Sequence, residues 1–369
     1  MKINFKKFIT ATVLALTLGL VSCDTTETTA VNENVTADVE TTNEVVQTTE
    51  TVEVEPEPEH IVEEVVMAED VYGFADASNE VVINEDSVTF VDERGSEVTI
   101  SKNPERVVPL VNSYANLWYE AGGDIVGRID SESELPEEYL GESISTVGDM
   151  TEVNMELLLD LDPDLVILRQ SKQADLIPLL EESSIPYITM EYNSMSDYLK
   201  YLKIFTALTG NEDLYIENGE NVLNDVNETI AKVPSENNPT VLLIFGTTSS
   251  LKAYLSNTAN GEMIAQLKGN NIADSWEDTD ATSIEINTEY VIDSDPDYIL
   301  VQCMSSEDGV RENIEATFGT TDWWNSLSAV KEGNVVYLDR AMFHYKPNSR
   351  YNEAYEELAD ILYPEVFGE

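Results

Sequence analysis

The chain has 369 residues, which is enough for about two domains. Acidic residues outnumber basic ones by 72 to 19, and the formal net charge is −53. This balance excludes the basic surface that nucleic-acid binding requires, so no nucleic-acid partner is expected.

The first residues have the pattern of a secretory signal. Lysines precede an apolar stretch, 8–20, that is too short to span a bilayer. The letters LVSC follow at 20–23 and resemble a bacterial lipobox. That resemblance implies removal of residues 1–22 and lipidation of Cys23, which would anchor the protein to the outer face of the cell membrane. An ordinary signal peptide, cut nearby, is the alternative.

Residues 23–83 are expected to form an acidic, disordered tether. The part from Asp24 to Glu80 contains 17 acidic residues and no lysine or arginine. Such a segment buries too little apolar surface to offset its conformational entropy, and its charges repel one another. We therefore expect the tether to be dispensable for ligand binding.

The order of elements after residue 84 predicts an N-terminal lobe, 84–195. Alternating residues flank the turn letters DERG, which indicates a hairpin at 87–100. Short apolar runs typical of buried strands then alternate with helical patterns. The predicted strands are 106–111, 124–129, 164–168 and 186–192, and the predicted helices are 114–121, 155–161 and 174–184.

A helical linker, 196–236, and a C-terminal lobe, 237–369, complete the chain. The linker includes a long helix near 211–233. In the second lobe, strands are predicted at 240–246, 297–302 and 334–339, and helices at 261–267, 287–295, 322–330 and 352–367. The predicted fold class is α/β, with two lobes that have mainly parallel central sheets and are joined by a long rigid interlobe helix.

One device occurs twice, 133 positions apart. Both segments, 154–168 and 287–301, read N-x-E, three apolar or aromatic residues, D-x-D-P-D and an apolar run. Asparagine suits a helix N-cap, glutamate suits the first turn, and proline ends the helix before a strand. Capping does not require that Glu156 and Glu289 both lie seven residues before the proline. The matched spacing predicts two carboxylates at equivalent corners of the two lobes.

From about residue 88 to residue 367, the chain resembles the substrate-binding proteins of ABC importers for iron complexes and cobalamin. The segments that carry the resemblance include VDERGSEVTI, VGDMTEVNMELLLDLDPDLVIL, SIPYITME and WWNSLSAVKEGNVVYLD. In that family, one glutamate on each lobe pairs with arginines of the membrane permease. The resemblance implies that Glu156 and Glu289 dock on a permease dimer, and that the protein acts as a monomer.

Ligands of open α/β sheets lie beyond the carboxyl ends of the strands. The predicted ligand contacts are Tyr114, Arg169, Tyr192, Phe245, Thr247, Met304, His344, Tyr345 and Lys346. This set is aromatic with a few cations, and it suits a flat or chelated ligand with anionic edges. Three of these residues have structural alternatives: Tyr114 in core packing, Arg169 in a pair with a local acid, and His344 as a hydrogen-bonded structural residue.

The family takes ferric siderophores, haem and cobalamin, so the resemblance implies an iron complex, a ferric siderophore or haem, as the transported ligand. Neither a cofactor nor a metal site is expected, except that His344 would coordinate iron if the ligand is haem. The sequence lacks G-x-S-x-G, H-E-x-x-H and P-loop motifs, so an enzyme is not expected. A surface glycosidase, which needs only two acids, and an adhesin remain as alternatives.

Overall fold

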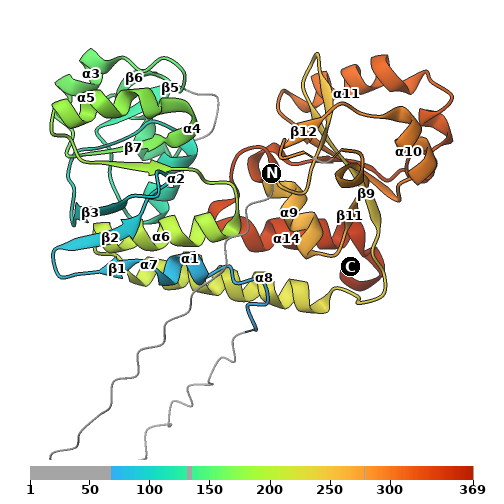
Figure 1. Cartoon of the computed structure of the whole chain (residues 1–369), viewed down its shortest axis with the longest axis horizontal. Coiled ribbons are helices and arrows are strands. Elements are labelled where there is room, and N and C mark those ends of the chain that lie inside the picture. The colour runs from blue at the N-terminus through green and yellow to red at the C-terminus, as the bar shows by residue number, and fades with distance from the viewer. Residues whose placement is uncertain (1–67, 131–134, 278, 369) are drawn as a thin grey trace, which may run out of the picture. The chain divides into compact units, whose positions relative to one another are not determined.

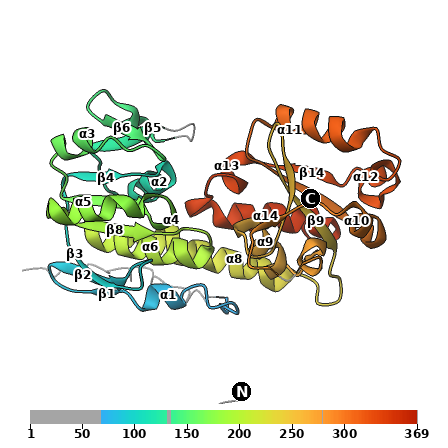
Figure 2. The ribbon, with the colours of Figure 1, turned by 45° about the horizontal axis from the view of Figure 1, so that its top comes forward.

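The computed structural model describes residues 68–130, 135–277 and 279–368. The signal segment, Cys23 and most of the predicted tether lie outside the described residues. Figure 1 and Figure 2 show two α/β lobes, the first built from the blue to green part of the chain and the second from the orange to red part.

Parallel strands form the centre of the first lobe. A three-stranded parallel sheet has the order β4-β7-β8, and β5 pairs with β6 in parallel beside it. The strands are β4 (Val107–Pro109), β5 (Gly127–Asp130), β6 (Ser145–Asp149), β7 (Leu165–Arg169) and β8 (Tyr187–Met190), and the helices between them are α2 (Asn112–Glu120), α3 (Met155–Asp160), α4 (Gln170–Gln173) and α5 (Ile177–Glu182). The first four residues of β7 are fully buried, as expected for a strand with both faces covered.

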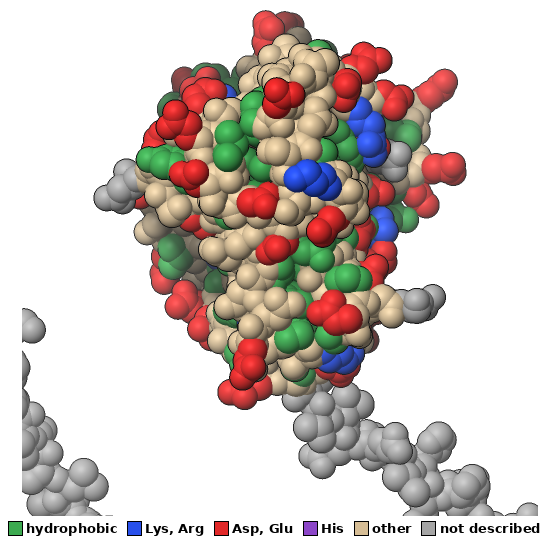
Figure 3. All heavy atoms as spheres, turned by 90° about the vertical axis from the view of Figure 1, so that its right-hand side faces the viewer, with side chains coloured by type: hydrophobic (Ala, Val, Ile, Leu, Met, Phe, Trp, Pro, Cys, Tyr) green, Lys and Arg blue, Asp and Glu red, His purple; other side chains and the backbone are tan. Residues whose placement is uncertain are grey.

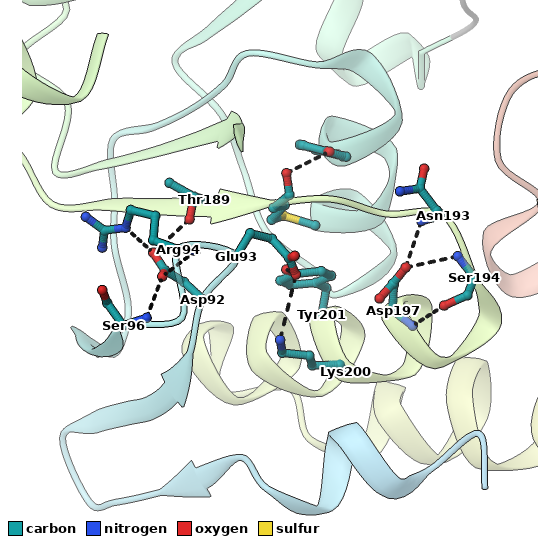
Figure 4. Close-up of polar contacts among 12 residues, drawn as sticks. Asp92, Glu93, Arg94, Ser96, Thr189, Asn193, Ser194, Asp197, Lys200 and Tyr201 are labelled. Carbon is teal, nitrogen blue, oxygen red and sulfur yellow. Dashed lines mark hydrogen bonds and ion pairs between the residues drawn. The ribbon is translucent and has the colours of Figure 1, made fainter. Parts of the chain in front are cut away.

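The predicted hairpin is confirmed as β2 (Ser87–Val91) and β3 (Glu97–Ser101), which pair antiparallel. Figure 4 shows how its turn is fixed to the lobe. Thr189 donates to the Asp92 carboxylate over 2.7 Å, and the Tyr201 hydroxyl donates to Glu93 over 2.6 Å. These bonds tie the turn to β8 and to α6 (Met195–Thr209).

The second lobe contains a six-stranded mixed sheet. Its order is β12-β10-β9-β13-β14, and β11 also pairs with β9. Strands β9, β11, β13 and β14 run parallel, whereas β10 and β12 are antiparallel additions that the sequence analysis did not predict. The strands are β9 (Thr240–Gly246), β10 (Leu251–Tyr254), β11 (Asn270–Asn271), β12 (Ser283–Ile284), β13 (Tyr298–Cys303) and β14 (Val335–Leu338), and the helices are α9 (Ala259–Gln266), α10 (Thr288–Ser294), α11 (Glu307–Ile314), α12 (Ser328–Glu332) and α13 (Arg340–Phe343).

Helices connect the two sheets. The predicted long helix is confirmed as a helical run that comprises α7 (Asp213–Tyr215), a π-helical turn at Ile216–Glu220 and α8 (Asn221–Lys232). In Figure 1 and Figure 2, α8 passes from beneath one lobe to beneath the other, beside α14 (Tyr351–Leu362). One continuous apolar core includes residues of β7 and β8, of α6, α8 and α14, and of β9 and β13.

The predicted end of the tether at residue 83 is wrong, because the described residues from 68 onward pack against the folded part. Phe74 is 1% exposed, and its ring meets the ring of Tyr355 edge to face. The segment also forms α1 (Asp76–Asn79) and β1 (Val82–Ile83). Composition alone concealed this, because a few aromatic residues at the end of an acidic tract supply enough apolar surface to bury. We call residues 68–83 the N-terminal strap.

The repeated device begins with the predicted helix caps. The Asn154 side chain accepts from the amide of Leu157 over 3.1 Å at the start of α3. The Asn287 side chain accepts from the amides of Glu289 and Tyr290 at the start of α10. Both helices therefore start directly after the asparagine that the sequence predicted as the N-cap.

The last aspartate of each copy fixes a neighbouring strand. Asp164 accepts from the amide of Arg106, just before β4, over 2.8 Å. Asp297 accepts from the amide of Thr240, the first residue of β9, also over 2.8 Å. Each aspartate thus joins the start of its own strand to the start of the adjacent parallel strand, a structural role that the cap interpretation did not include.

Candidate ligand-binding cleft

A cavity of about 310 Å³ lies beyond the carboxyl ends of the central strands of both lobes. The first lobe contributes Arg169, at the end of β7, and Asn193, after β8. The second lobe contributes most of the wall, namely Tyr254, 257–260, Met263, Thr282, Gln302, 342–347 and Tyr351. The cavity is therefore an interlobe cleft with side chains from both lobes.

On the first-lobe side, Arg169 is held in place by an acid. Its Nε donates to the Glu191 carboxylate over 3.0 Å, and the same carboxylate accepts from the amide of Ser171 over 2.6 Å. The terminal guanidinium nitrogens of Arg169 make no hydrogen bond to other described residues. Arg169 thus has both of the roles weighed from the sequence: it pairs with a local acid and it lines the cleft.

The loop that carries Asn193 is fixed by the start of α6. The Asp197 carboxylate accepts from the amides of Asn193 and Ser194, and the Ser194 hydroxyl accepts in return from the amide of Asp197. Figure 4 shows this reciprocal capping box. It holds the backbone at the cleft edge without using the Asn193 side chain, which remains available to a ligand.

On the second-lobe side, the segment after α13 supplies His344, Tyr345 and Lys346. The Asn260 side chain supports this wall, since its Nδ2 donates to Gln302 over 2.8 Å and to the carbonyl of Phe343 over 2.9 Å. These bonds join the start of α9, the end of β13 and the end of α13. The polar wall is therefore built before any ligand arrives.

Lys346 reaches toward the first lobe. Its ammonium nitrogen lies 5.2 Å from the centroid of the Tyr192 ring. Burial and, to a lesser extent, the nearby positive charge of Arg169 lower the pKa of Lys346 to about 8, while the carboxylates of Asp197 and Glu191 act in the opposite direction. Two cations from opposite lobes therefore meet at the same cleft.

His344 is half-buried beside two other cations. Burial lowers its pKa, and the charges of Arg340 and Lys346 lower it further, so the ring is neutral at pH 7. Its Nδ1 is buried and accepts no hydrogen bond from the described residues. Arg340 donates to the carbonyl of Met304 and to the hydroxyl of Tyr345, which lines the cleft.

Several predicted contacts do not line this cavity. Tyr114 is 2% exposed and its hydroxyl donates to the carbonyl of Met190, so it packs in the core. Tyr192 is equally buried and lies behind Lys346. Phe245 stacks on Tyr254 at 4.4 Å and thus supports the wall from behind. Thr247 closes the turn to β10, and Met304 is exposed outside the lining residues.

Sequence reasoning missed Asn193, Tyr254, Asn257 and Asn260. Tyr254 lies on β10, which is antiparallel and so falls outside the strand-helix alternation used for prediction. Asn257 lies between that unpredicted strand and α9, and Asn260 lies in the first turn of α9. A hairpin interpretation of GTTSS at 246–250 would have found β10, because the turn separates two apolar runs.

The predicted docking residues lie on the repeated helices, Glu156 on α3 and Glu289 on α10, and both are exposed. Neither carboxylate forms an ion pair or a side-chain hydrogen bond with another described residue. Within the described ranges, no group of three or more metal-ligating side chains comes together. None of the described helices is long and apolar enough to cross a membrane.

Two α/β lobes that enclose a preformed polar cleft at their strand ends define a bilobed solute-binding protein. The chain belongs to the periplasmic binding protein family, whose profile matches residues 107–342.

Individual relatives agree with this assignment. The ABC transporter substrate-binding lipoprotein YvrC of Bacillus subtilis, itself uncharacterised, is 27% identical over 291 residues, which cover 76% of this chain and 87% of that protein. The Fe(3+)-citrate-binding protein YfmC of Bacillus subtilis is 26% identical over 263 residues, covering 70% and 80%. The crystal structure of Staphylococcus aureus IsdE complexed with heme has a TM-score of 0.59 at 22% identity, covering 71% of this chain and 100% of that chain, and it supports the fold.

Proposed function

We propose that this protein captures an iron complex with anionic edges in the interlobe cleft and delivers it to the permease of an ABC importer. The observation that carries the proposal is the meeting of Arg169 and Lys346 from opposite lobes, in a chain whose net charge is −53. Cations are scarce in this sequence, so their convergence at one cavity indicates an anionic ligand. Two relatives from Bacillus subtilis, an Fe(3+)-citrate-binding protein and an iron(3+)-hydroxamate-binding protein, suggest the chemical class.

A compact ferric chelate suits the cleft best. The cavity of about 310 Å³ lies at the lower end of the range for small-molecule sites. The amide of Asn193 and the two cations would contact the outer oxygens of such a chelate. The amide nitrogens of Asn257 and Asn260 already donate to protein oxygens and shape the wall instead. The iron would remain coordinated by the chelator, so the protein needs no metal ligands of its own.

Haem is the second candidate because of His344. A neutral imidazole with an unpartnered Nδ1, lining the cavity, has the chemistry of an axial ligand to haem iron. The propionates of haem would then face Arg169 and Lys346.

The same proposal includes the anchor and the docking surface. Lipidated Cys23 would hold the protein at the outer face of the cell membrane, and Glu156 and Glu289 would contact the permease dimer. The exposure of both carboxylates on the two copies of one device supports this assignment.

Titration of the purified protein tests the ligand class. Ferric citrate, a ferric hydroxamate, a ferric catecholate, haem and cobalamin would each be added while tryptophan fluorescence is recorded. We expect one anionic ferric chelate to bind, and Arg169→Gln and Lys346→Gln each to weaken it by about tenfold or more. The exposed Lys172→Gln, on α4, is the matched control and should bind normally.

The pH dependence of the same titration separates the two cations. The affinity of the parent for an anionic chelate should fall as the pH rises through about 8, because Lys346 loses its proton there. Lys346→Arg keeps its charge and should remain flat over this range. If none of the five compounds binds, the proposed ligand class is wrong. If haem alone binds and His344→Ala alters its Soret band, the second candidate replaces the first.

A further inference from the structure

Helices α3 and α10 each expose a pair of large apolar side chains next to the docking glutamate. The exposed fractions are 44% for Leu157, 41% for Leu159, 46% for Tyr290 and 44% for Ile292. These residues occupy equivalent positions in the two copies of the repeated device. Between them, Leu158 and Val291 are fully buried and make the core contacts of this part of each helix.

The fold does not explain why the flanking positions are apolar. Helix caps, strand starts and the core are satisfied by other residues of the device, namely the two asparagines, the two final aspartates, Leu158 and Val291. Polar residues at the flanks would stabilise these parts equally and improve solubility. Exposed apolar side chains that recur at matched positions instead indicate a contact surface.

The sizes of the ionic and apolar contributions to binding support the same conclusion. An exposed ion pair shifts a binding equilibrium by a factor of only about five or less. Two such pairs, one per lobe, would bind a partner weakly, and physiological salt would screen their attraction further. Apolar side chains that become buried on docking would add a contribution that salt does not screen.

We propose that Leu157 and Leu159 on the first lobe, with Tyr290 and Ile292 on the second, form the apolar part of the contact with the outer face of the importer's permease subunits. This inference rests on the proposed function. It commits to that partner because the surface occurs twice, as a partner with two equivalent subunits requires. Each apolar pair also adjoins a carboxylate without an ion pair, which suits a partner surface that carries a cation beside aliphatic side chains.

The contact surfaces on the two lobes differ in shape and chemistry. Beside Glu289 lies a hollow of about 400 Å³, lined by Trp276, Tyr290 and three glutamates. The rings of Trp276 and Tyr290 are 6.1 Å apart, and the indole nitrogen has no hydrogen-bond partner among the described residues. An aromatic, acidic hollow suits a guanidinium or ammonium group. The second lobe should therefore contribute the larger share of the docking affinity.

Site-specific photocrosslinking in whole cells tests the surface. A benzoylphenylalanine would replace Leu159 or Ile292 in the full chain, and Leu179 or Val366, which are 44% and 46% exposed elsewhere, would serve as controls. We expect both test positions, and neither control, to crosslink to an integral membrane subunit of an ABC importer, identified by mass spectrometry. Crosslinks to a second copy of this chain or to lipid alone would overturn the proposal.

Uptake of the ligand by cells gives the quantitative test. Leu157→Ser with Leu159→Ser should reduce uptake several-fold, and Tyr290→Ser with Ile292→Ser should reduce it more, while the affinity of the purified protein for its ligand stays unchanged. Leu179→Ser with Val366→Ser should have no effect. Normal uptake by both test variants would refute the surface. Failure of the purified parent to bind any iron complex would refute the proposed function instead. The crosslinks would still decide whether the surface contacts a permease, because they do not depend on the identity of the ligand.

Discussion

At the scale of single residues, Glu120 shows how a carboxyl group can join the two lobes. It ends α2 in the first lobe, and its two oxygens accept from the amide and the hydroxyl of Ser349, each over 3.2 Å. Burial raises the pKa of Glu120 to about 7, although the bonds from Ser349 act in the opposite direction. The neighbouring Asn348 accepts from the Tyr192 hydroxyl, so the segment before α14 is fixed to the first lobe at two points.

This pKa makes stability depend on pH with a definite sign. The folded form binds the Glu120 proton more tightly than the unfolded chain, so the stabilising contribution is fully present below about pH 4.5 and is lost as the pH rises through about 7. We expect the melting temperature of the parent to fall between pH 5 and pH 8 by more than that of Glu120→Gln.

Repulsion among the other carboxylates lowers the stability of both proteins over this range, so the comparison between them is the readout. The exposed Glu142→Gln is the control, and it should behave like the parent. Equal losses in the parent and in Glu120→Gln would show that Glu120 does not titrate near pH 7.

The cleft was predictable from the sequence where strands end. Ligands of open α/β sheets lie beyond the carboxyl ends of the strands. That rule correctly placed three residues that follow predicted parallel strands at the cavity, namely Arg169, His344 and Lys346. The rule failed for Tyr114 and Tyr192 because an aromatic side chain beyond a strand can turn toward the core as readily as toward the cleft. Sequence position fixes where the backbone goes, whereas the direction of a large ring depends on packing across elements distant in the chain.

At the scale of elements, the N-terminal strap joins parts of both lobes. The Tyr72 hydroxyl donates to the carbonyl of Gln266 on α9, and Phe74 packs on Tyr355 of α14. Ser78 accepts from the Tyr215 hydroxyl on α7, near the first lobe. The strap therefore holds helices of the two lobes together on the side of α8.

Phe74→Ala should lower the free energy of unfolding by about 3 to 5 kcal/mol, the usual cost of a cavity left by a buried phenylalanine. Urea denaturation followed by circular dichroism measures it. Tyr72→Phe removes one partly exposed hydroxyl and should cost about 1 kcal/mol. A chain that starts at residue 84 should be destabilised at least as much as Phe74→Ala. A loss below about 1 kcal/mol for Phe74→Ala would show that the N-terminal strap adds little to stability and is better regarded as part of the tether.

The parallel elements were more predictable than the antiparallel ones. Strands β4, β7, β8, β9 and β13 are largely buried on both faces and read as continuous apolar runs, so pattern alone located them. The partly buried edge strand β14 was located by the same apolar pattern. Strand β12 is a two-residue edge strand, and nothing in its composition distinguishes it from loop. Strand β10 has mixed burial, and only the turn before it indicates a strand. The π-helical turn at Ile216–Glu220 was likewise not predicted from the sequence.

At the scale of the whole molecule, one apolar core runs from the first sheet through α6, α8 and α14 to the second sheet. Bending between the lobes would require this core to open, as well as breaking backbone hydrogen bonds in the helical run Asp213–Lys232. We therefore expect the lobes to move little when the ligand binds. The sequence indicated the helix, but the shared core depends on side chains from many elements of both lobes and could not be read from any one of them.

Cleft cations in an acidic chain also affect how fast a ligand arrives. The face in Figure 3 carries many acidic and few basic side chains, so an anionic chelate is repelled at long range and attracted only within the cleft. Dissolved salt screens the distant charges more than the enclosed ones. The association rate of the chelate, measured by stopped-flow fluorescence, should therefore rise as salt is increased from about 10 to 150 mM, opposite to ordinary electrostatic steering. An association rate that falls with salt would mean that the cleft cations dominate the field well beyond the protein surface.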